Sequence, residues 1–359
     1  MRDFGQFVAA VCLAGIVVHA DRAPVQSQDK DAAAILAAAR EALGGESKLA
    51  AIKSFVATGR TRQVRGNNLV PIEFEIACEL PDKYVRKDEI PAQESDPTSS
   101  GFNGDQLIQI PPPPPPRAGG PPPGPGREGA APPVAAAPPA AAEAGRAGAP
   151  PPVSGAPARG GGPPVDPRRA RVNTVKQDFA KLTLGMFAAS FPSYPLAFSR
   201  AGQAEAPQGK ADVLEVKGPD GSNFSARLFI NSQSHQPIMV SWQAPPSNVV
   251  VTAPGQPAPK PETLAPGTVV VEGPPAPPAT ASKEETDKYA KDVADLRRKT
   301  QAKLVEHRIY YADYRDAGNG VMFPFRLRRA IGADTVEETN FDAFRLNQKI
   351  DPRRFEPVK

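Results

Sequence analysis

The stretch that decides the fold is VPIEFEIACEL, residues 70–80. Apolar side chains occupy the even positions from Val70 to Cys78, and glutamates occupy three of the odd positions from Glu73 to Glu79. Successive side chains of a strand point to opposite faces, so this alternation predicts a β-strand with one apolar and one polar face. The apolar face covers either a packed core or an apolar ligand, because both are lined by the same residue types.

The same alternation recurs on both sides of this strand, with turn signals such as Pro219-Asp220-Gly221 between the segments. Strands are predicted over residues 54–65, 70–80, 84–90, 105–110, 211–218, 223–233, 238–243, 307–316, 321–330 and 335–347. Helical spacing of apolar residues predicts helices over residues 29–45, 47–53, 170–190 and 282–304. Many short strands with few helices favour an antiparallel sheet over alternating βα units.

The third of these helices carries an apolar stripe and leads into a stretch, Leu182 to Phe198, that contains no charge. Pro192 and Pro195 cannot continue a helix, so we do not interpret this stretch as a membrane span. A buried helix fits the pattern, and so does a mobile lid or an element that touches a membrane surface.

Proline is concentrated in two stretches of the chain, which holds 45 prolines among 359 residues. Neither stretch has the apolar side chains needed to fold alone, so we interpret both as disordered insertions within one domain. The predicted organisation is a signal peptide (1–20), the first half of the domain with its N-terminal helix (21–110), a Pro/Gly/Ala-rich insertion (111–167), a lid helix with the middle strands (168–244), a second Pro-rich insertion (245–282), and a charged helix with the C-terminal strands (283–359).

The first residues predict export. Arg2 precedes an apolar run from Phe7 to Val18, and the small-residue sequence ending at Ala20 is typical of a signal-peptide cleavage site. The run has about a dozen residues, short of the roughly 20 that cross a bilayer, although an uncleaved anchor is the alternative. Cleavage would leave one cysteine, Cys78, which we interpret as a small buried hydrophobe and not as half of a disulfide.

No catalytic or metal-binding motif stands out, so we predict a protein that is not an enzyme and has no cofactor or metal. His235 and His307 lack a second histidine or a cysteine at metal-ligand spacing, and both are interpreted as solvated histidines. Carboxylates are explained by polar strand faces and turns; they are Asp313, Asp316, Asp334, Glu337 and Glu338. The formal net charge of +4 is modest for this length and gives no case for nucleic acid.

Arginines gather in two separate places along the sequence, at Arg60, Arg62 and Arg65 and again at Arg326, Arg328 and Arg329. Each group fits a solvated strand edge, and each fits a surface that meets anionic lipid headgroups.

Several segments, taken together and in this order, resemble the periplasmic lipoprotein-carrier family of LolA-like and LolB-like proteins. They are ESKLAAIKSFVATGRTRQV, FEIACELPDKYVRKDEI, SGFNGDQLIQI, RLFINSQSHQPIMVSW, YYADYRDAGNGVMFPFRLRRA and the closing FRLNQKIDPRRFEPV. The last resembles the closing pattern N-x-x-I-D-x-x-x-F-x-x-P seen in outer-membrane lipoprotein-sorting relatives, although here Pro357 follows Phe355 after one residue. One position departs from the family, because Leu80 precedes Pro81 where well-studied carriers have an arginine that is tied to lid locking and cargo release.

The resemblance implies a mainly β (α+β) fold, an incomplete antiparallel β-barrel with lid helices, in a monomeric periplasmic protein. It implies a ligand, the acyl chains of a lipoprotein or another lipid, held between sheet and lid. The positions that would line the cavity are Val70, Ile72, Phe74, Ile76, Ile108, Ile110, Phe179, Leu182, Met186, Leu228, Ile230, Val240 and Trp242.

Two hypotheses follow. The first is a non-enzymatic carrier of lipid or lipoprotein acyl chains. The second is an interaction or sensor module of the cell envelope on the same scaffold, whose Pro-rich loops engage a protein partner. Deletion of residues 111–167 would leave a carrier's lipid binding intact, whereas it would abolish partner capture by a sensor.

Overall fold

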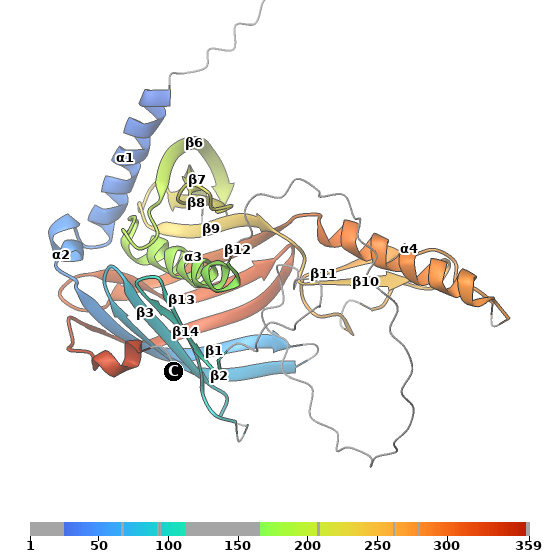
Figure 1. Ribbon diagram of the computed structural model, residues 1–359. Helices are drawn as coiled ribbons and strands as arrows, with labels where there is room; N and C mark the ends of the chain where they lie inside the picture. Colours follow the sequence, from blue (N-terminus) through green and yellow to red (C-terminus); the bar gives the residue numbers. More distant parts are fainter. Residues whose placement is uncertain are drawn as a thin grey trace, which may run out of the picture.

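Twelve strands form one antiparallel sheet in the computed structural model, which describes residues 25–65, 68–91, 93, 95–112, 166–206, 209–260, 263–278 and 280–356 (Figure 1). From one edge to the other the strands are β5 (Gln106–Ile110), β4 (Thr98–Asn103), β3 (Lys83–Glu89), β2 (Asn68–Glu79), β1 (Ser54–Arg65), β14 (Asp334–Leu346), β13 (Met322–Ile331), β12 (Val305–Asp316), β9 (Pro237–Ala244), β8 (Ser225–Asn231), β7 (Gly209–Lys217) and β6 (Ala197–Ala206). Within the described residues the edge strands β5 and β6 do not pair, so the sheet stays open. The predicted fold class, an antiparallel sheet not closed into a barrel, is confirmed.

The strand that contains the opening stretch, β2, has the two faces that its alternation predicts. Ile72, Phe74, Ile76 and Cys78 are all buried, while Glu73 is exposed on the other face. Phe74, Ile76 and Cys78 belong to the large apolar cluster at the centre of the protein. The apolar face of this strand therefore helps to form the main core.

One helix, α3 (Pro167–Phe187), occupies the concave face of the sheet, and Figure 1 shows the strands curving around it. It packs against β4, β5, β9 and β13, which come from both halves of the sheet. The N-terminal helix α1 (Val25–Ala42) packs along β6, and the short α2 (Glu46–Ala50) leads into β1. Buried side chains on one side of α1, such as Leu36 and Ala39, join the same core.

The convex face is covered in part by the C-terminal segment, which ends in the short 3₁₀ helix η2 (Pro352–Phe355). Ile350 and Phe355 pack there in a second apolar cluster, whose other members are Val56, Ala77, Val85 and Ile108. The side-chain amide of Asn347 ties this segment to the start of β1, since its Oδ1 accepts from the Lys53 amide at 2.7 Å and its Nδ2 donates to Ala51 O at 3.1 Å. The closing sequence pattern thus has a structural role at each of these positions.

The second Pro-rich stretch differs from its prediction. Within residues 245–282, predicted as a disordered insertion, β10 (Asn248–Thr252) and β11 (Thr268–Glu272) pair in parallel register. The charged helix α4 (Lys283–Gln301) packs against β10 and starts with a capping box between Ser282 and Glu285. Each strand contains a run of three valines, a residue that favours β-strands. The prediction of disorder rested on the many prolines around these runs.

The other predicted elements are largely present, with two omissions in the main sheet. Strands β4 and β6 were not predicted, and fourteen strands are described where about ten were expected. β6 is interrupted by a register shift between Arg200 and Gly202, which breaks its alternation. The predicted signal peptide and all but the ends of the insertion over 111–167 lie outside the described residues.

Candidate functional site: the concave face and its helix

The helix on the concave face has well-defined ends. The Asp166 side chain accepts a hydrogen bond from the Arg168 amide at 2.9 Å, and Pro167 occupies the first helical position. At the other end Ala188 adopts a left-handed conformation with φ 45°. Every residue from Phe179 to Phe187 is buried, so this part of the helix is covered around its whole circumference.

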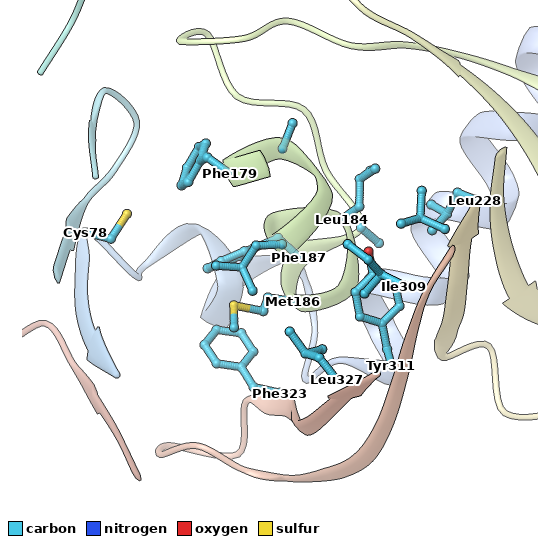
Figure 2. Packing of buried hydrophobic residues seen from close by; sticks show 14 of the residues in the cluster. Cys78, Phe179, Leu184, Met186, Phe187, Leu228, Ile309, Tyr311, Phe323 and Leu327 are labelled. Atoms are coloured by element: carbon cyan, nitrogen blue, oxygen red, sulfur yellow. The ribbon is translucent and has the colours of Figure 1, made fainter. Parts of the chain in front are cut away.

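Aromatic side chains fill the space between α3 and the sheet, as Figure 2 shows around Phe179 and Phe187. The Phe179 ring centroid lies 5.4 Å from those of Tyr84 and Phe102. The Phe187 ring lies 5.1 Å from Phe323 in an edge-to-face arrangement. Such pairs add to the stabilisation from buried area alone. The concave face in this structure is therefore a packed core beneath α3.

Packing is tightest where α3 crosses β12. A Cβ atom added to Gly185 would lie 2.4 Å from the ring of Tyr311, closer than carbon atoms approach without displacement. The Tyr311 hydroxyl donates to Lys181 O, and the Tyr314 hydroxyl lies 2.9 Å from Gly185 O and 2.7 Å from Pro237 O. Burial raises the pKa of both tyrosines well above the ordinary value. Two neutral tyrosines of one strand thus hold the backbone of the helix.

The side of α3 that faces β3 and β13 is polar. Lys181 Nζ lies 2.9 Å from Asp178 Oδ1 and 4.4 Å from the Trp242 ring. Burial on its own would raise the pKa of Asp178, but Lys181, Arg329 and Arg86 lower it below the ordinary value. The charges of Asp178, Lys181, Arg329 and Arg86 therefore compensate one another on this part of the concave face.

A hollow of about 260 Å³ opens at the C-terminal end of α3. Its apolar lining comes from Leu49, Ile52, Leu80, Phe187 and Phe191. The remaining lining residues are Arg40, Glu46, Ala50, Lys53, Pro81 and Ala189. Phe187 also belongs to the central core, so the wall of this hollow adjoins the apolar interior beneath the helix.

The cations at the rim of this hollow make contacts with nearby groups. Arg40 forms an ion pair with Glu46 through Nε, and its Nη1 donates to Ala188 O at 3.4 Å. Lys53 Nζ donates to Ala50 O at 2.9 Å. Both side chains are therefore held next to the opening, Arg40 by an ion pair and a carbonyl and Lys53 by a carbonyl.

A second hollow of about 650 Å³ lies beside β10 and β11 and is lined by polar and apolar residues of that region.

Most of the predicted cavity-lining residues meet in one place. Eight of them join the central cluster on the α3 side of the sheet, namely Phe74, Ile76, Phe179, Leu182, Met186, Leu228, Ile230 and Val240. Ile72 is buried on the same parity of β2, Val70 is half-buried, and Trp242 is partly buried against the cluster. Whether any of them contacts a lipid stays a prediction.

Two predicted residues lie elsewhere. Ile108 belongs to the second cluster on the convex face, where Phe355 covers it, and Ile110 is 39% exposed. The neighbour Leu107, on the opposite parity, packs against the central core instead. Residues that the sequence did not single out include Tyr311, Tyr314 and the aromatic rings of β13 and β14; the alternation of those strands was the available signal.

The two histidines differ in their surroundings. His235 lies exposed in the turn between β8 and β9, as predicted. His307 is half-buried, its ring stacks on Trp242 with centroids 5.4 Å apart, and its Nε2 lies 3.3 Å from Pro245 O. The interpretation of His307 as a solvated histidine was wrong, because the base of the β10–β11 region covers it.

The described residues contain neither a candidate metal cluster nor a helix that could span a membrane. No cluster of three or more histidine, cysteine, aspartate or glutamate side chains in that part of the chain is arranged to hold a metal ion. None of the described helices combines the length and apolar character needed to span a bilayer.

Comparisons with known proteins return no matching family model and no matching curated protein. Among solved structures, the chain is similar to a LolA superfamily protein of Nitrosomonas europaea, with 11% identity and a TM-score of 0.43 over 90% of this chain and 97% of that one. It is similar to a Vibrio parahaemolyticus domain described as an outer membrane lipoprotein-sorting protein, with 8% identity and a TM-score of 0.40 over 90% and 97%. A DUF1329 family protein of Desulfovibrio piger has 8% identity and a TM-score of 0.39 over 93% and 97%. The first two carry the names of the families that the sequence resembles.

Proposed function

We propose that the protein is a non-enzymatic periplasmic carrier that binds acyl chains of lipids or lipoproteins beneath α3, which acts as a lid. The observation that carries this proposal is the apolar hollow at the C-terminal end of α3, next to Leu80 and Phe187. An acyl chain that enters there would follow the apolar side chains toward the concave face of the sheet. The resemblance of the sequence to lipoprotein carriers points to the same class of ligand.

Binding of an acyl chain would exchange the apolar contacts between helix and sheet for apolar contacts between the acyl chain and the sheet. Each buried CH2 group contributes about 0.8 kcal/mol, so a chain that replaces Phe187 and Phe191 against the sheet compensates the helix contacts it removes. The residues after α3 carry no charge until Arg200, so displacement of that segment separates no ion pair, whereas displacement of α3 itself separates Lys176 from Asp105. A lid that is packed closed without ligand and opens with it fits these contacts.

The rim of the hollow suits an amphipathic ligand. Lys53 places a cation beside the opening, and Arg40, which pairs with Glu46 through Nε, places a second one there. Guanidinium and ammonium groups bind phosphate and carboxylate oxygens. The acyl chains would lie inside, and an anionic head group would stay at the surface with these cations. We expect the bound molecule to be a phospholipid or an acylated protein segment and not a neutral hydrocarbon.

The test is lipid analysis of the protein purified gently from a bacterial periplasm. We expect stoichiometric phospholipid or acyl adducts by native mass spectrometry and uptake of a fluorescent fatty acid. Ala189→Trp would fill the hollow and abolish uptake, whereas Ala343→Trp, on an exposed position of the convex face, would leave it unchanged. A mass free of adducts together with no uptake would overturn the carrier proposal and favour the interaction module.

A further inference from the structure

The two groups of arginines that are far apart in the sequence lie on neighbouring positions of the sheet. Strand β14 separates β1 from β13, and the register places Arg60 and Arg326 on opposite sides of Asn340. Two residues further along, Arg62 and Arg328 lie on opposite sides of Glu338. We call these four arginines, Arg60, Arg62, Arg326 and Arg328, the arginine surface.

The arginine surface lies on the convex face of the sheet. On β1 its positions alternate with Gly59 and Thr61, and Gly59 pairs with the core residue Phe341. All four arginines are exposed. Arg329, predicted as part of the same group, has the opposite parity, pairs with Glu337 and faces the α3 side. The side chain of Arg65 lies outside the described part of the structure.

The four guanidinium groups are only weakly compensated. Arg60 lies 3.8 Å from Glu73, but these side chains are 71% and 59% exposed, so the pair contributes little. Arg326 Nε donates to Asn340 Oδ1 at 3.4 Å, and Arg328 stacks over the Tyr310 ring at 4.4 Å. Neither contact neutralises a charge. Among the described residues, none forms a hydrogen bond or ion pair with Arg62. Free donors therefore remain on this surface.

The spacing of these groups follows from the sheet. Adjacent strands are about 4.8 Å apart and alternate residues about 6.8 Å apart, so the four side chains start from a rectangle of roughly 10 by 7 Å. The positions are rigid because β1, β14 and β13 are central strands. A guanidinium group binds phosphate oxygens in a bidentate manner, which an exposed and weakly paired arginine is free to do.

We propose that the arginine surface docks the protein on the anionic phospholipid headgroups of a bilayer. Lipids diffuse in the plane of the membrane, so headgroups reach fixed cations without a shape-matched partner. A stable protein interface is usually anchored by well-packed, fully desolvated residues near its centre. The centre of this surface holds Asn340 and Glu338 instead. The proposal goes beyond acyl binding, because this surface is on the face opposite α3.

The experiment is sedimentation of the purified protein with vesicles. Vesicles of phosphatidylcholine with about 30 mol % phosphatidylglycerol should bind the protein, pure phosphatidylcholine should not, and salt should weaken the binding. Because each arginine near an anionic membrane contributes about 1 kcal/mol, Arg62→Gln with Arg328→Gln should lower the partition coefficient about 30-fold. Lys288→Gln with Lys291→Gln, two exposed positions of α4, makes the same change of charge and should alter binding little.

Two results would overturn the proposal. The first is equal sedimentation of the arginine variant and the unaltered protein. The second is absence of binding to anionic vesicles while a polyglutamate column retains the protein through Arg62 and Arg328, which would assign the surface to an acidic protein. Uptake of a fluorescent fatty acid by the arginine variant should match that of the unaltered protein, so failure of the carrier proposal is recognised separately.

Discussion

The hydroxyl of Tyr311 donates a hydrogen bond to the backbone carbonyl of Lys181, so a strand in the centre of the sheet is tied directly to the helix on its concave face. Tyr311 is 1% exposed, so its hydroxyl is shielded from bulk water while the helix is in place. The carrier proposal requires this bond to break when the lid opens. Its strength therefore contributes to the balance between closed and open states.

Tyr311→Phe should loosen α3 without unfolding the sheet. Removal of one buried hydrogen bond is expected to lower the free energy of unfolding by about 1 kcal/mol. Amide hydrogen exchange should become faster in α3 and stay unchanged in β1 and β14. Tyr289→Phe, on α4, is the matched control and should leave exchange in α3 as it was. A uniform increase in exchange over the whole sheet would contradict a specific tie to the helix.

Gly185→Ala should lower the free energy of unfolding, although alanine is more favourable than glycine inside a helix by about 1 kcal/mol. The added Cβ would lie 2.4 Å from the Tyr311 ring, and overpacking of this kind costs about 1–3 kcal/mol. Urea denaturation measures the change. Tyr311→Leu in the same chain should relieve the overlap, so the two substitutions together should cost less than their separate effects added. Simple additivity would show that the ring is not the obstacle.

His307 should make the protein less stable in mild acid. Burial, with the positive charges of Lys181 and Arg329, lowers the pKa of His307 below its ordinary value, and the hydrogen bond to Pro245 O offsets this only in part. The unfolded chain therefore takes up a proton at a higher pH than the folded protein does. Accordingly, the free energy of unfolding should fall as the pH drops below about 6.5 and level off below the folded pKa.

The check is urea denaturation of His307→Gln at about pH 7.5 and about pH 5.5. The variant should show a smaller decrease in stability between the two pH values than the unaltered protein. His235→Gln is the control because His235 is exposed in a turn, and it should leave the decrease unchanged. An identical pH dependence in all three proteins would contradict the assignment of the acid effect to His307.

Phe355→Ala should be strongly destabilising for a residue so close to the end of the chain. Phe355 is 1% exposed beneath the convex face, and truncation of a buried phenylalanine costs about 3–5 kcal/mol. Its exposed neighbour Arg353 is the matched control, and Arg353→Ala should change stability by about 0.5 kcal/mol or less. Thermal denaturation that does not distinguish the two variants would show that the C-terminal segment only rests on the sheet.

Alternation was sufficient to predict the strands with one polar face, and Ile72, Phe74 and Ile76 lie where it places them. It failed at β5 for a physical reason. Ile108 and Leu107 are both apolar because both faces of the sheet are covered there, by Phe355 on one side and by α3 on the other. The alternation within one strand does not show which of its two apolar faces packs against α3 and which packs against the C-terminal segment.

Other parts of the site depend on contacts between distant segments, which one sequence does not reveal. The proximity of Arg62 to Arg328 follows from the insertion of β14 between β1 and β13. The burial of His307 follows from the folding of residues around Pro245 over its ring. The resemblance to a family predicted the open sheet, whereas the filling of its concave face by Phe179 and Phe187 became visible only in the structure.

The central pairing of β1 with β14 has a consequence for biogenesis. β14 is the last strand of the described residues, and it joins the strands from the first part of the chain to those from the second. Until it pairs, β1 and β13 each have an open edge, and such edges promote aggregation. The two half-sheets are thus joined by contacts between distant segments, which slow folding. Folding without aggregation therefore requires that both edges stay protected until β14 pairs with them.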